Sequence, residues 1–186
     1  MKPKRMIFLD RDGVVNVNPI YLDYVKKPSE FHFLPGTRRA VKMLTDAGFD
    51  ITVVSNQGGV AKGLFTKEDL NRIDNKMMRG VRASGGVIRK SYYCIHHPDA
   101  GCECRKPKTG LIKKAVGKKR IDHKNSYFVG DTERDVIAGN TFGLKTITVL
   151  SGYNDRKKIK KWKISPDFIA RDLLEAANKV ILNNSA

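Results

Sequence analysis

The feature that most constrains the fold is a series of short apolar runs, each of which ends at a polar residue or a glycine. The first runs from Met6 to Leu9 and stops at Asp10, which is the length and pattern of a strand buried on both faces. Runs of the same kind cover residues 49–54, 126–129 and 145–150, with a weaker one at 91–93. Helical patterns separate or follow them, at residues 37–47, 66–82, 109–116, 133–142 and 167–182. This alternation predicts an α/β fold, a Rossmann-like parallel sheet with helices on both faces.

Length and composition indicate one domain. The chain of 186 residues has the usual size of a single domain, so we expect residues 1–186 to form one unit. Apolar residues make up 40% of the chain, which excludes an intrinsically disordered protein. No apolar run is long enough to cross a bilayer, and the first residues contain too few apolar positions for a signal peptide. We therefore expect a cytoplasmic protein without a membrane partner, and we expect a monomer.

Two segments interrupt the regular alternation. Residues 16–36 contain three prolines and are long enough for an extra hairpin or flap over a crevice. Residues 156–163 are mostly basic, and a solvated loop or helix face is their simplest interpretation. The net charge of +17 fits a binder of nucleic acid or of an anionic membrane, and it equally fits an enzyme with an anionic substrate. A basic, zinc-bearing nucleic-acid-binding module with residues 156–163 as its contact strip is therefore one alternative.

Carboxylates follow two of the predicted strands. Asp10 and Asp12 stand two residues apart after the first strand, and Gly13 permits the chain to turn sharply there. One carboxylate can attack phosphorus, while the other protonates the leaving oxygen and later activates water. Asp131 follows the strand at 126–129, and together with Asp10 it could hold Mg²⁺, which prefers oxygen ligands. Because parallel strands end at the same edge of a sheet, we expect these carboxylates in one crevice.

Groups that suit a phosphate follow the same pattern. Ser55 and Asn56 end the second strand and offer a hydroxyl and an amide to phosphate oxygens. Arg105 and Lys106 supply positive charge, which an anionic nucleophile needs when it attacks an anionic phosphate. The carboxylates argue against a nucleic-acid partner, since without metal they would repel its phosphates. A phosphate-accepting receiver domain would also use an aspartate and a lysine, but it has no use for Asp12 as an acid.

The three cysteines form a separate cluster with a histidine. All three lie within eleven residues, in the pattern Cys94-x-His96-x5-Cys102-x-Cys104. An odd number of cysteines packed this closely does not suit disulfides, whereas three thiolates and one imidazole complete a tetrahedral Zn²⁺ shell. A shell with no open position is structural rather than catalytic. Two cations follow the cluster directly in the sequence, so bound zinc would hold them in place.

Taken together and in this order, the strand-end motifs resemble those of the haloacid dehalogenase (HAD) superfamily of phosphohydrolases, over nearly the whole chain. The resemblance implies a HAD-like fold with Asp10 as the nucleophile. It implies that Asp12 is the general acid and base and that its main-chain carbonyl also meets magnesium. It further implies Ser55 as the phosphate-binding hydroxyl, Lys106 as the charge-neutralising lysine and Asp131 as the carboxylate ligand of magnesium.

With the cysteine cluster included, the chain resembles a narrower family of small, capless phosphatases that act on heptose bisphosphate or histidinol phosphate. Residues 55–63, 93–98 and 106–110 are more similar to the heptose branch. The resemblance implies a small phosphorylated metabolite as partner, foremost a heptose 1,7-bisphosphate that loses its 7-phosphate, with histidinol phosphate or another sugar phosphate as the alternative. Asp135 fits an outer position that holds a metal-bound water or a neighbouring ligand. The implied substrate contacts are Asn18, Tyr21, Ser55, Asn56, Gln57, Arg105 and Lys106.

Overall fold

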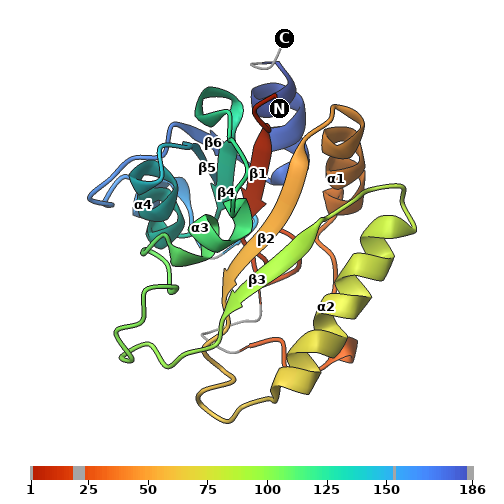
Figure 1. Cartoon of the computed structure of the whole chain (residues 1–186), viewed down its shortest axis with the longest axis vertical. Helices are drawn as coiled ribbons and strands as arrows, with labels where there is room; N and C mark the ends of the chain where they lie inside the picture. Colours follow the sequence, from red (N-terminus) through yellow and green to blue (C-terminus); the bar gives the residue numbers. More distant parts are fainter. Residues whose placement is uncertain (1, 19–23, 153, 184–186) are drawn as a thin grey trace.

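The computed structural model describes residues 2–18, 24–152 and 154–183. A six-stranded sheet lies at its centre, with the strand order β3-β2-β1-β4-β5-β6 and every neighbouring pair parallel (Figure 1). The strands are β1 (Met6–Leu9), β2 (Asp50–Asn56), β3 (Lys90–Cys94), β4 (Tyr127–Gly130), β5 (Lys145–Val149) and β6 (Phe168–Ala170). The helices are α1 (Thr37–Asp46), α2 (Lys67–Arg82), α3 (Gly110–Val116), α4 (Glu133–Thr141), α5 (Arg156–Ile159) and α6 (Leu173–Glu175), and α6 continues as the π-helical segment η3 (Ala176–Leu182). Two short 3₁₀ turns are η1 (Pro28–Glu30) and η2 (His123–Asn125). The predicted α/β class and parallel sheet are confirmed.

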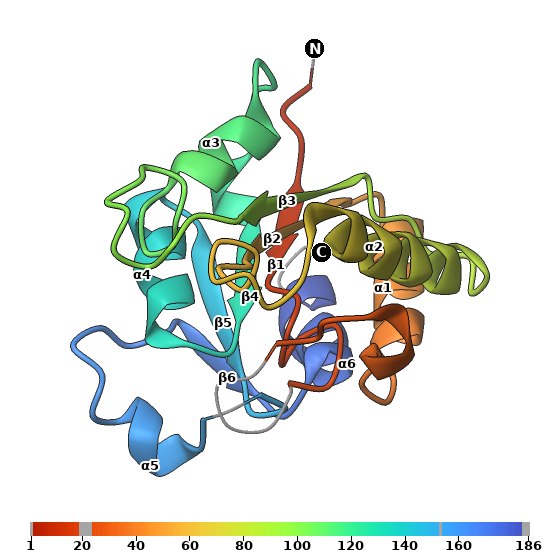
Figure 2. The same ribbon diagram turned by 90° about the horizontal axis from the view of Figure 1, so that it is seen from below.

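Each face of the sheet is covered by a different group of helices. Ile7 and Leu9 of β1 belong to a core that includes α1, α2 and the helical segment from α6 onward. Met6 and Phe8, which alternate with them, belong to a second core that includes α3 and α4. Figure 2 shows the two groups of helices on opposite sides of the sheet. Because both faces are covered, the central strand β1 is apolar and buried along its whole length.

Local sequence determines where the long helices begin and end. At the start of α2, the Thr66 hydroxyl accepts the Asp69 N–H at 3.0 Å, and the Asp69 carboxylate accepts the Thr66 N–H at 3.0 Å. This reciprocal pair is a capping box, which satisfies N–H groups that have no partner inside the helix. After α1, Gly48 adopts a left-handed φ of 79°, a conformation that glycine adopts without steric cost and that ends helices.

The prediction of a single helix over residues 167–182 is wrong in its first part. Residues 168–170 form β6, the edge strand beside β5. The Asp167 carboxylate accepts the main-chain N–H and the hydroxyl of Thr146 at 2.6 and 2.8 Å, which fixes the start of β6 against β5. The side chain of Asp172 then accepts the Glu175 N–H, so the helix begins only after Asp172. A strand of three residues is too short for its alternation to be distinguished from a helical pattern.

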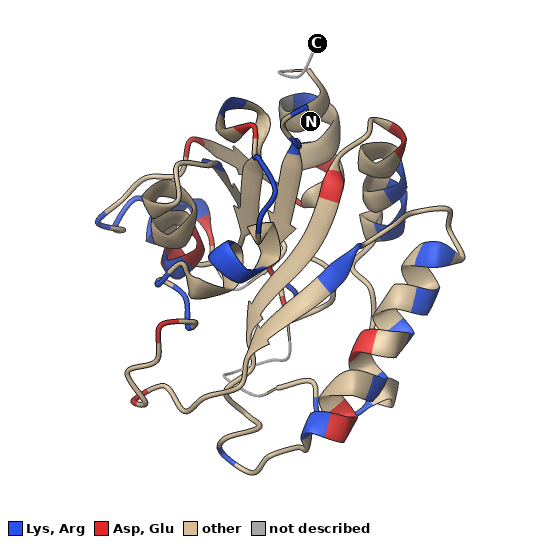
Figure 3. Cartoon of the chain, viewed as in Figure 1, with Lys and Arg blue, Asp and Glu red and all other residues tan. Residues whose placement is uncertain are grey.

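The two segments set apart by the sequence contain little regular structure. Within residues 16–36, the described part shows an isolated antiparallel bridge between Asn16 and Phe33 and the turn η1, rather than a full hairpin. In residues 156–163, the short helix α5 buries Ile159 and leaves its basic residues exposed. Lys and Arg are also spread over α1, α2 and α3, so positive charge does not single out the α5 segment (Figure 3). In the described part of the chain, no helix has the length and apolar character needed to cross a membrane.

The strand order determines which loops meet at the carboxyl ends of the strands. The chain proceeds from β1 to β2 and β3 on one side, and it returns to pair β4 with the other side of β1. At such a reversal of strand order, the loops leaving neighbouring strands diverge and open a crevice at their carboxyl ends. The segments that follow β1, β2 and β4 therefore meet there, as the sequence predicts.

Candidate active site and metal centre

The carboxylate of Asp10 lies directly after β1 at the carboxyl edge of the sheet. The turn of the chain after β1 brings the Arg11 main-chain N–H to 2.7 Å from Oδ1 of Asp10. The other oxygen, Oδ2, is 2.9 Å from Nζ of Lys106. Burial raises the pKa of Asp10, Lys106 opposes this effect, and the nearby charge of Asp135 adds to it, so the net pKa is above the usual value.

Lys106 is a buried cation held between two carboxylates. Its side chain is 2% exposed, and Nζ lies 2.9 Å from Asp10 and 2.6 Å from Asp135. Burial by itself lowers the pKa of Lys106, but the two carboxylates outweigh burial and raise it overall, so the ammonium stays protonated. The predicted cation is thus present beside the predicted nucleophile.

Asn56 fixes the main chain of Lys106. Its amide Nδ2 donates to the Lys106 carbonyl at 3.1 Å, and its Oδ1 accepts the Lys106 N–H at 3.0 Å. This reciprocal pair joins the end of β2 to the loop before α3, across 50 positions of sequence. Both ends of the amide are therefore bonded to main chain, whereas the sequence predicts contacts to phosphate oxygens.

Asp131 follows β4 and packs against two glycines. It is 1% exposed, and its carboxylate leaves no room for side chains at Gly13 or Gly152, where an added Cβ would lie 2.4 or 2.0 Å from Oδ2. Asn18 Nδ2 is 3.5 Å from the same oxygen, which places the first described part of the predicted flap beside Asp131. Tyr21, the second flap residue predicted to contact substrate, lies outside the described residues.

Asp10, Asp131 and Asp135 form a carboxylate group that suits a divalent cation. One oxygen of each lies within 4.8 Å of the others, and all three residues are buried. Lys106 pairs with two of them, Asp10 and Asp135. Buried negative charge of this kind requires compensation, and hard oxygen ligands favour Mg²⁺. The donor set therefore fits magnesium.

The second predicted catalytic carboxylate, Asp12, is held by an array of donors. Arg11 donates to it through Nε and Nη2, at distances of 3.0 to 3.1 Å. Asn16 Nδ2 donates to Oδ1 at 2.9 Å, and Gln57 Nε2 donates to Oδ2 at 2.8 Å. Gln57 also donates to the Ser55 hydroxyl at 3.3 Å, so its amide connects Asp12 with the predicted phosphate-binding serine.

Sequence reasoning missed Arg11. Its side chain is fully buried, whereas an arginine between two aspartates reads as exposed surface. Burial lowers the pKa of Arg11, but Asp12 and its hydrogen bonds raise it overall, so the guanidinium stays charged. The only clue in the sequence is its position directly after a strand that is buried on both faces, where the chain turns inward.

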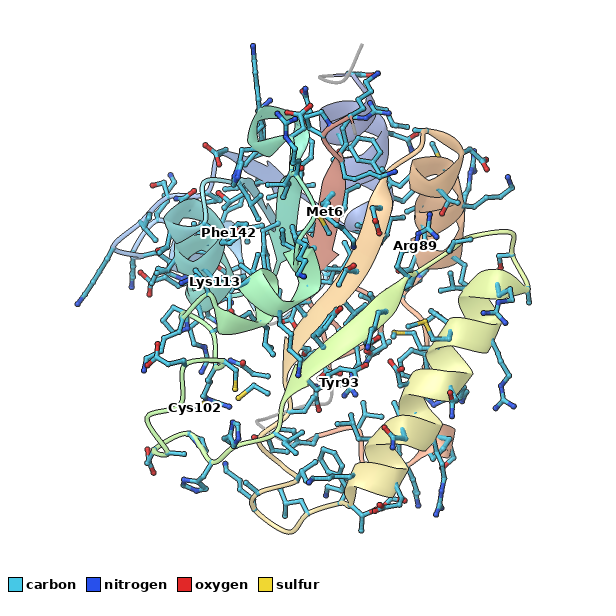
Figure 4. All side chains as sticks on the ribbon, in the orientation of Figure 1. Met6, Arg89, Tyr93, Cys102, Lys113 and Phe142 are labelled. Carbon is cyan, nitrogen blue, oxygen red and sulfur yellow. The ribbon has the colours of Figure 1, made fainter. Side chains whose placement is uncertain are left out.

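The cysteines and His96 converge at the end of β3 and in the loop that leads from it to α3. Five sulfur–sulfur and sulfur–Nδ1 distances among Cys94, His96, Cys102 and Cys104 lie between 3.1 and 3.7 Å. Ligands about 2.0–2.3 Å from a tetrahedral zinc ion are separated by roughly 3.5–3.8 Å, so the group fits zinc. Figure 4 shows Cys102 in this loop and Tyr93 on the strand that leads to it. The neighbouring His97 is not part of this group.

Arg105 connects the cysteine loop to the crevice. Its Nη1 is buried, and no hydrogen-bond partner reaches that atom in the described part of the protein. A Cβ at Gly58 would lie 3.2 Å from Nη1 and 3.2 Å from the His96 carbonyl, so the absence of a side chain at residue 58 leaves space for the guanidinium. Among the described residues predicted to contact substrate, Arg105 lies beside Gly58, Ser55 lies beside Gln57, and Asn56 bonds the main chain of Lys106.

The fold and these groups define a HAD-like phosphatase. A HAD-hydrolase-like family model matches residues 103–176. The 7-phosphatase of D-glycero-β-D-manno-heptose 1,7-bisphosphate from Bordetella bronchiseptica is 39% identical over 155 residues, covering 83% of this chain and 85% of that protein. The D-glycero-D-manno-heptose 1,7-bisphosphate 7-phosphatase of Chlorobaculum tepidum is 31% identical over 194 residues, covering 98% and 96%. This chain belongs to the heptose bisphosphate phosphatase family.

The crystal structure of the B. bronchiseptica D,D-heptose 1,7-bisphosphate phosphatase, in complex with magnesium and phosphate, superposes with a TM-score of 0.88. The two chains are 35% identical in that superposition, which covers 96% of this chain and 99% of the other. The similarity therefore extends over nearly the whole fold and includes both sides of the crevice.

Proposed function

We propose that this protein is a magnesium-dependent phosphomonoesterase that removes the 7-phosphate of D-glycero-D-manno-heptose 1,7-bisphosphate through an aspartyl-phosphate on Asp10. The observation that carries the proposal is the buried Asp10–Lys106 pair, 2.9 Å apart, at the reversal point of the sheet. A carboxylate kept beside a fixed ammonium can attack an anionic phosphate, because the cation offsets the repulsion between the two anions. The names of the relatives supply the substrate class.

In the first step, an oxygen of Asp10 attacks phosphorus, and the bond from phosphorus to the sugar oxygen breaks. The electron pair of that bond stays on the sugar oxygen, which takes the proton of the Asp12 carboxyl and leaves as an alcohol. Lys106 and the hydroxyl of Ser55 bind the phosphate oxygens, while Asn56 keeps Lys106 in place. The products are the dephosphorylated sugar position, a phosphoryl group on Asp10 and an ionised Asp12.

In the second step, the Asp12 carboxylate takes a proton from a water whose oxygen attacks phosphorus. The bond between phosphorus and Asp10 breaks, and its electron pair returns to Asp10. Orthophosphate leaves, and Asp12 is protonated again for the next cycle. The contacts of Arg11 and Gln57 with Asp12 keep its carboxylate in one orientation for both transfers.

Two metals accompany this chemistry in our proposal. Asp10, Asp131 and the main-chain carbonyl of Asp12 would hold Mg²⁺, which when bound offsets the charge of the carboxylates and of the phosphate. Asp135 takes the outer role and holds Lys106. Cys94, His96, Cys102 and Cys104 would hold Zn²⁺ and keep the loop that carries Arg105 and Lys106 rigid.

Phosphate release from a substrate panel tests the assignment. We expect kcat/KM to be highest for heptose 1,7-bisphosphate when it is compared with histidinol phosphate, other sugar phosphates and a nucleotide, all with magnesium. A flat profile would remove the heptose assignment and leave a general phosphatase. A preference for histidinol phosphate would favour the alternative substrate.

Replacement of the nucleophile tests the mechanism. We expect Asp10→Asn to lower turnover by several orders of magnitude, because an amide is a poor nucleophile and a weaker magnesium ligand. Retention of more than about one hundredth of the wild-type rate would contradict the role of Asp10.

A further inference from the structure

Arg11 is the largest side chain that is fully buried in the described residues, and it carries a positive charge. Removing a guanidinium from water is costly unless a carboxylate and further acceptors receive its donors. Arg11 meets most of this requirement with Asp12: Nε lies 3.1 Å from Oδ1, and Nη2 lies 3.0 Å from both Oδ1 and Oδ2. Only Nη1 is buried without a hydrogen-bond partner in the described residues. Donors from two nitrogens on one carboxylate fix its rotation as well as its position.

The pair spans the boundary between core and crevice. The side chain of Arg11 is 0% exposed, whereas that of Asp12 is 18% exposed. Asn16 and Gln57 each add a donor to one of the Asp12 oxygens, at 2.9 and 2.8 Å. The carboxyl group is therefore anchored from behind and remains accessible at the crevice, as a group that exchanges protons with a substrate must be.

Arg11 is itself held from the strand and helix behind it. Its guanidinium carbon lies 5.9 Å from the centre of the Tyr93 ring on β3, within the range of a cation–π contact. The Tyr93 hydroxyl donates to Asp74 of α2 at 2.6 Å, which fixes the ring in turn. Gln57 Oε1 accepts from Arg11 Nη2 at 3.1 Å. The orientation of Asp12 thus depends on a buried chain of contacts that reaches α2.

We propose that Arg11 is a positioning residue that aims the Asp12 carboxyl at the leaving-group oxygen, with Tyr93 and Asp74 holding Arg11 in place. The proposal rests on the proposed function, since it assigns proton transfer to Asp12. Arg11 has no contact with substrate and acts only through Asp12. Its removal should therefore affect the proton transfer and spare the attack by Asp10.

The dependence of the rate on the leaving group separates these two steps. A sugar alkoxide is a poor leaving group and needs the proton from Asp12 as the bond to phosphorus breaks. A nitrophenolate leaves without that proton. Because kcat/KM reports on steps up to the first irreversible one, it measures formation of the aspartyl-phosphate for both substrates.

The experiment compares kcat/KM for heptose 1,7-bisphosphate and for p-nitrophenyl phosphate in wild type and Arg11→Lys. Lysine keeps the charge but lacks the planar fork. We expect Arg11→Lys to lower kcat/KM for the sugar phosphate about 10- to 100-fold, as is typical when a supporting residue of a site is lost, and to change the aryl substrate by less than about threefold. In an Asp12→Asn background, Arg11→Lys should cause no further loss.

Arg5→Lys is the matched control. Arg5 lies just before β1, whereas Arg11 lies just after it. Arg5 stacks over the ring of Phe49 at 4.5 Å and donates to the Ala47 carbonyl, away from the site. We expect Arg5→Lys to lower thermal stability without any selective loss of kcat/KM for the sugar phosphate. If Arg11→Lys does not fold, Tyr93→Leu serves instead, because it removes the ring behind the guanidinium. We expect Tyr93→Leu to lower kcat/KM selectively for the sugar phosphate as well, but by a smaller factor.

Equal losses on both substrates, no loss, or a gain on the sugar phosphate would overturn the positioning role while leaving the phosphatase function in place. Additive losses in the Asp12→Asn background would do the same. A wild-type protein that hydrolyses neither substrate would instead refute the proposed function. If Asp12→Asn itself showed no preference between leaving groups, Asp12 would not be the acid, and both proposals would fail.

Discussion

Asp135 performs two tasks with its two oxygens, and replacing it by asparagine separates them. Oδ2 accepts the main-chain N–H and the hydroxyl of Thr132 at 3.0 and 2.6 Å, which caps the start of α4. Oδ1 lies 2.6 Å from Nζ of Lys106. In Asp135→Asn, the amide oxygen can still accept from Thr132, but an NH₂ group then faces the ammonium. The cap is kept and the ion pair is lost.

The contacts determine the expected size of the effect. Loss of a hydrogen bond to a charged partner costs about 1.5–3 kcal/mol, and loss of a negative charge at a helix N-terminus costs about 0.3–1 kcal/mol. We therefore expect Asp135→Asn to lower the free energy of unfolding by roughly 2–4 kcal/mol, and Asp135→Ala to lower it by about 1 kcal/mol more because the cap is lost too. Both variants should lower kcat about 10- to 100-fold, since Lys106 keeps only Asp10 as an anchor.

The assay is urea unfolding followed by circular dichroism in the presence of a chelator, together with kcat at saturating magnesium. The chain supplies a control in Asp69, whose Oδ2 accepts the main-chain N–H and the hydroxyl of Thr66 at 3.0 and 2.8 Å. Its Oδ1 lies 3.6 Å from the exposed Arg72 rather than beside a buried lysine. Asp69→Asn should cost less stability and leave kcat unchanged. If Asp135→Asn kept kcat within about threefold of wild type, or if Asp69→Asn lowered it equally, the reasoning would be refuted.

Three further predictions follow from other parts of the structure. Gly152→Ala places a Cβ 2.0 Å from the Asp131 carboxylate, so the magnesium concentration for half-maximal activity should rise about tenfold or more; an unchanged magnesium titration would contradict this. Cys102→Ser should lose zinc in metal analysis and raise KM while circular dichroism shows the sheet intact; a wild-type protein purified from zinc-replete medium without zinc would contradict the zinc assignment, and unfolding of the variant would show that zinc supports the core. The Arg171 N–H and Lys179 lower the pKa of Glu175 from 4.5 to about 2, so this carboxylate stabilises the fold above about pH 4.5, and the contribution disappears as the pH falls towards 2. Urea unfolding should therefore show wild type more stable than Glu175→Gln at neutral pH, with the gap closing in acid, and a gap that does not depend on pH would count against that shift.

The sequence by itself was sufficient for the fold class and for the positions of the site motifs. Strands buried on both faces leave continuous apolar runs, so four runs placed β1, β2, β4 and β5 within one or two residues. Parallel strands end at one edge of the sheet, so the residues after them had to meet. The spacing of the cysteines and His96 was likewise enough to predict that these four residues cluster, because they lie within eleven residues of one another.

The partners of each side chain were decided only by the tertiary structure. Asn56 bonds the main chain of Lys106 across 50 positions, and no local pattern encodes that contact. Asp135 lies close enough to Lys106 and to the other carboxylates to belong to the site, which depends on how α4 packs against the sheet. The burial of Arg11 depends on the turn after β1 and on Tyr93 from β3. Periodicity and spacing determine which residues reach the edge of the sheet, whereas the rotation of each side chain there is set by packing between segments far apart in the sequence.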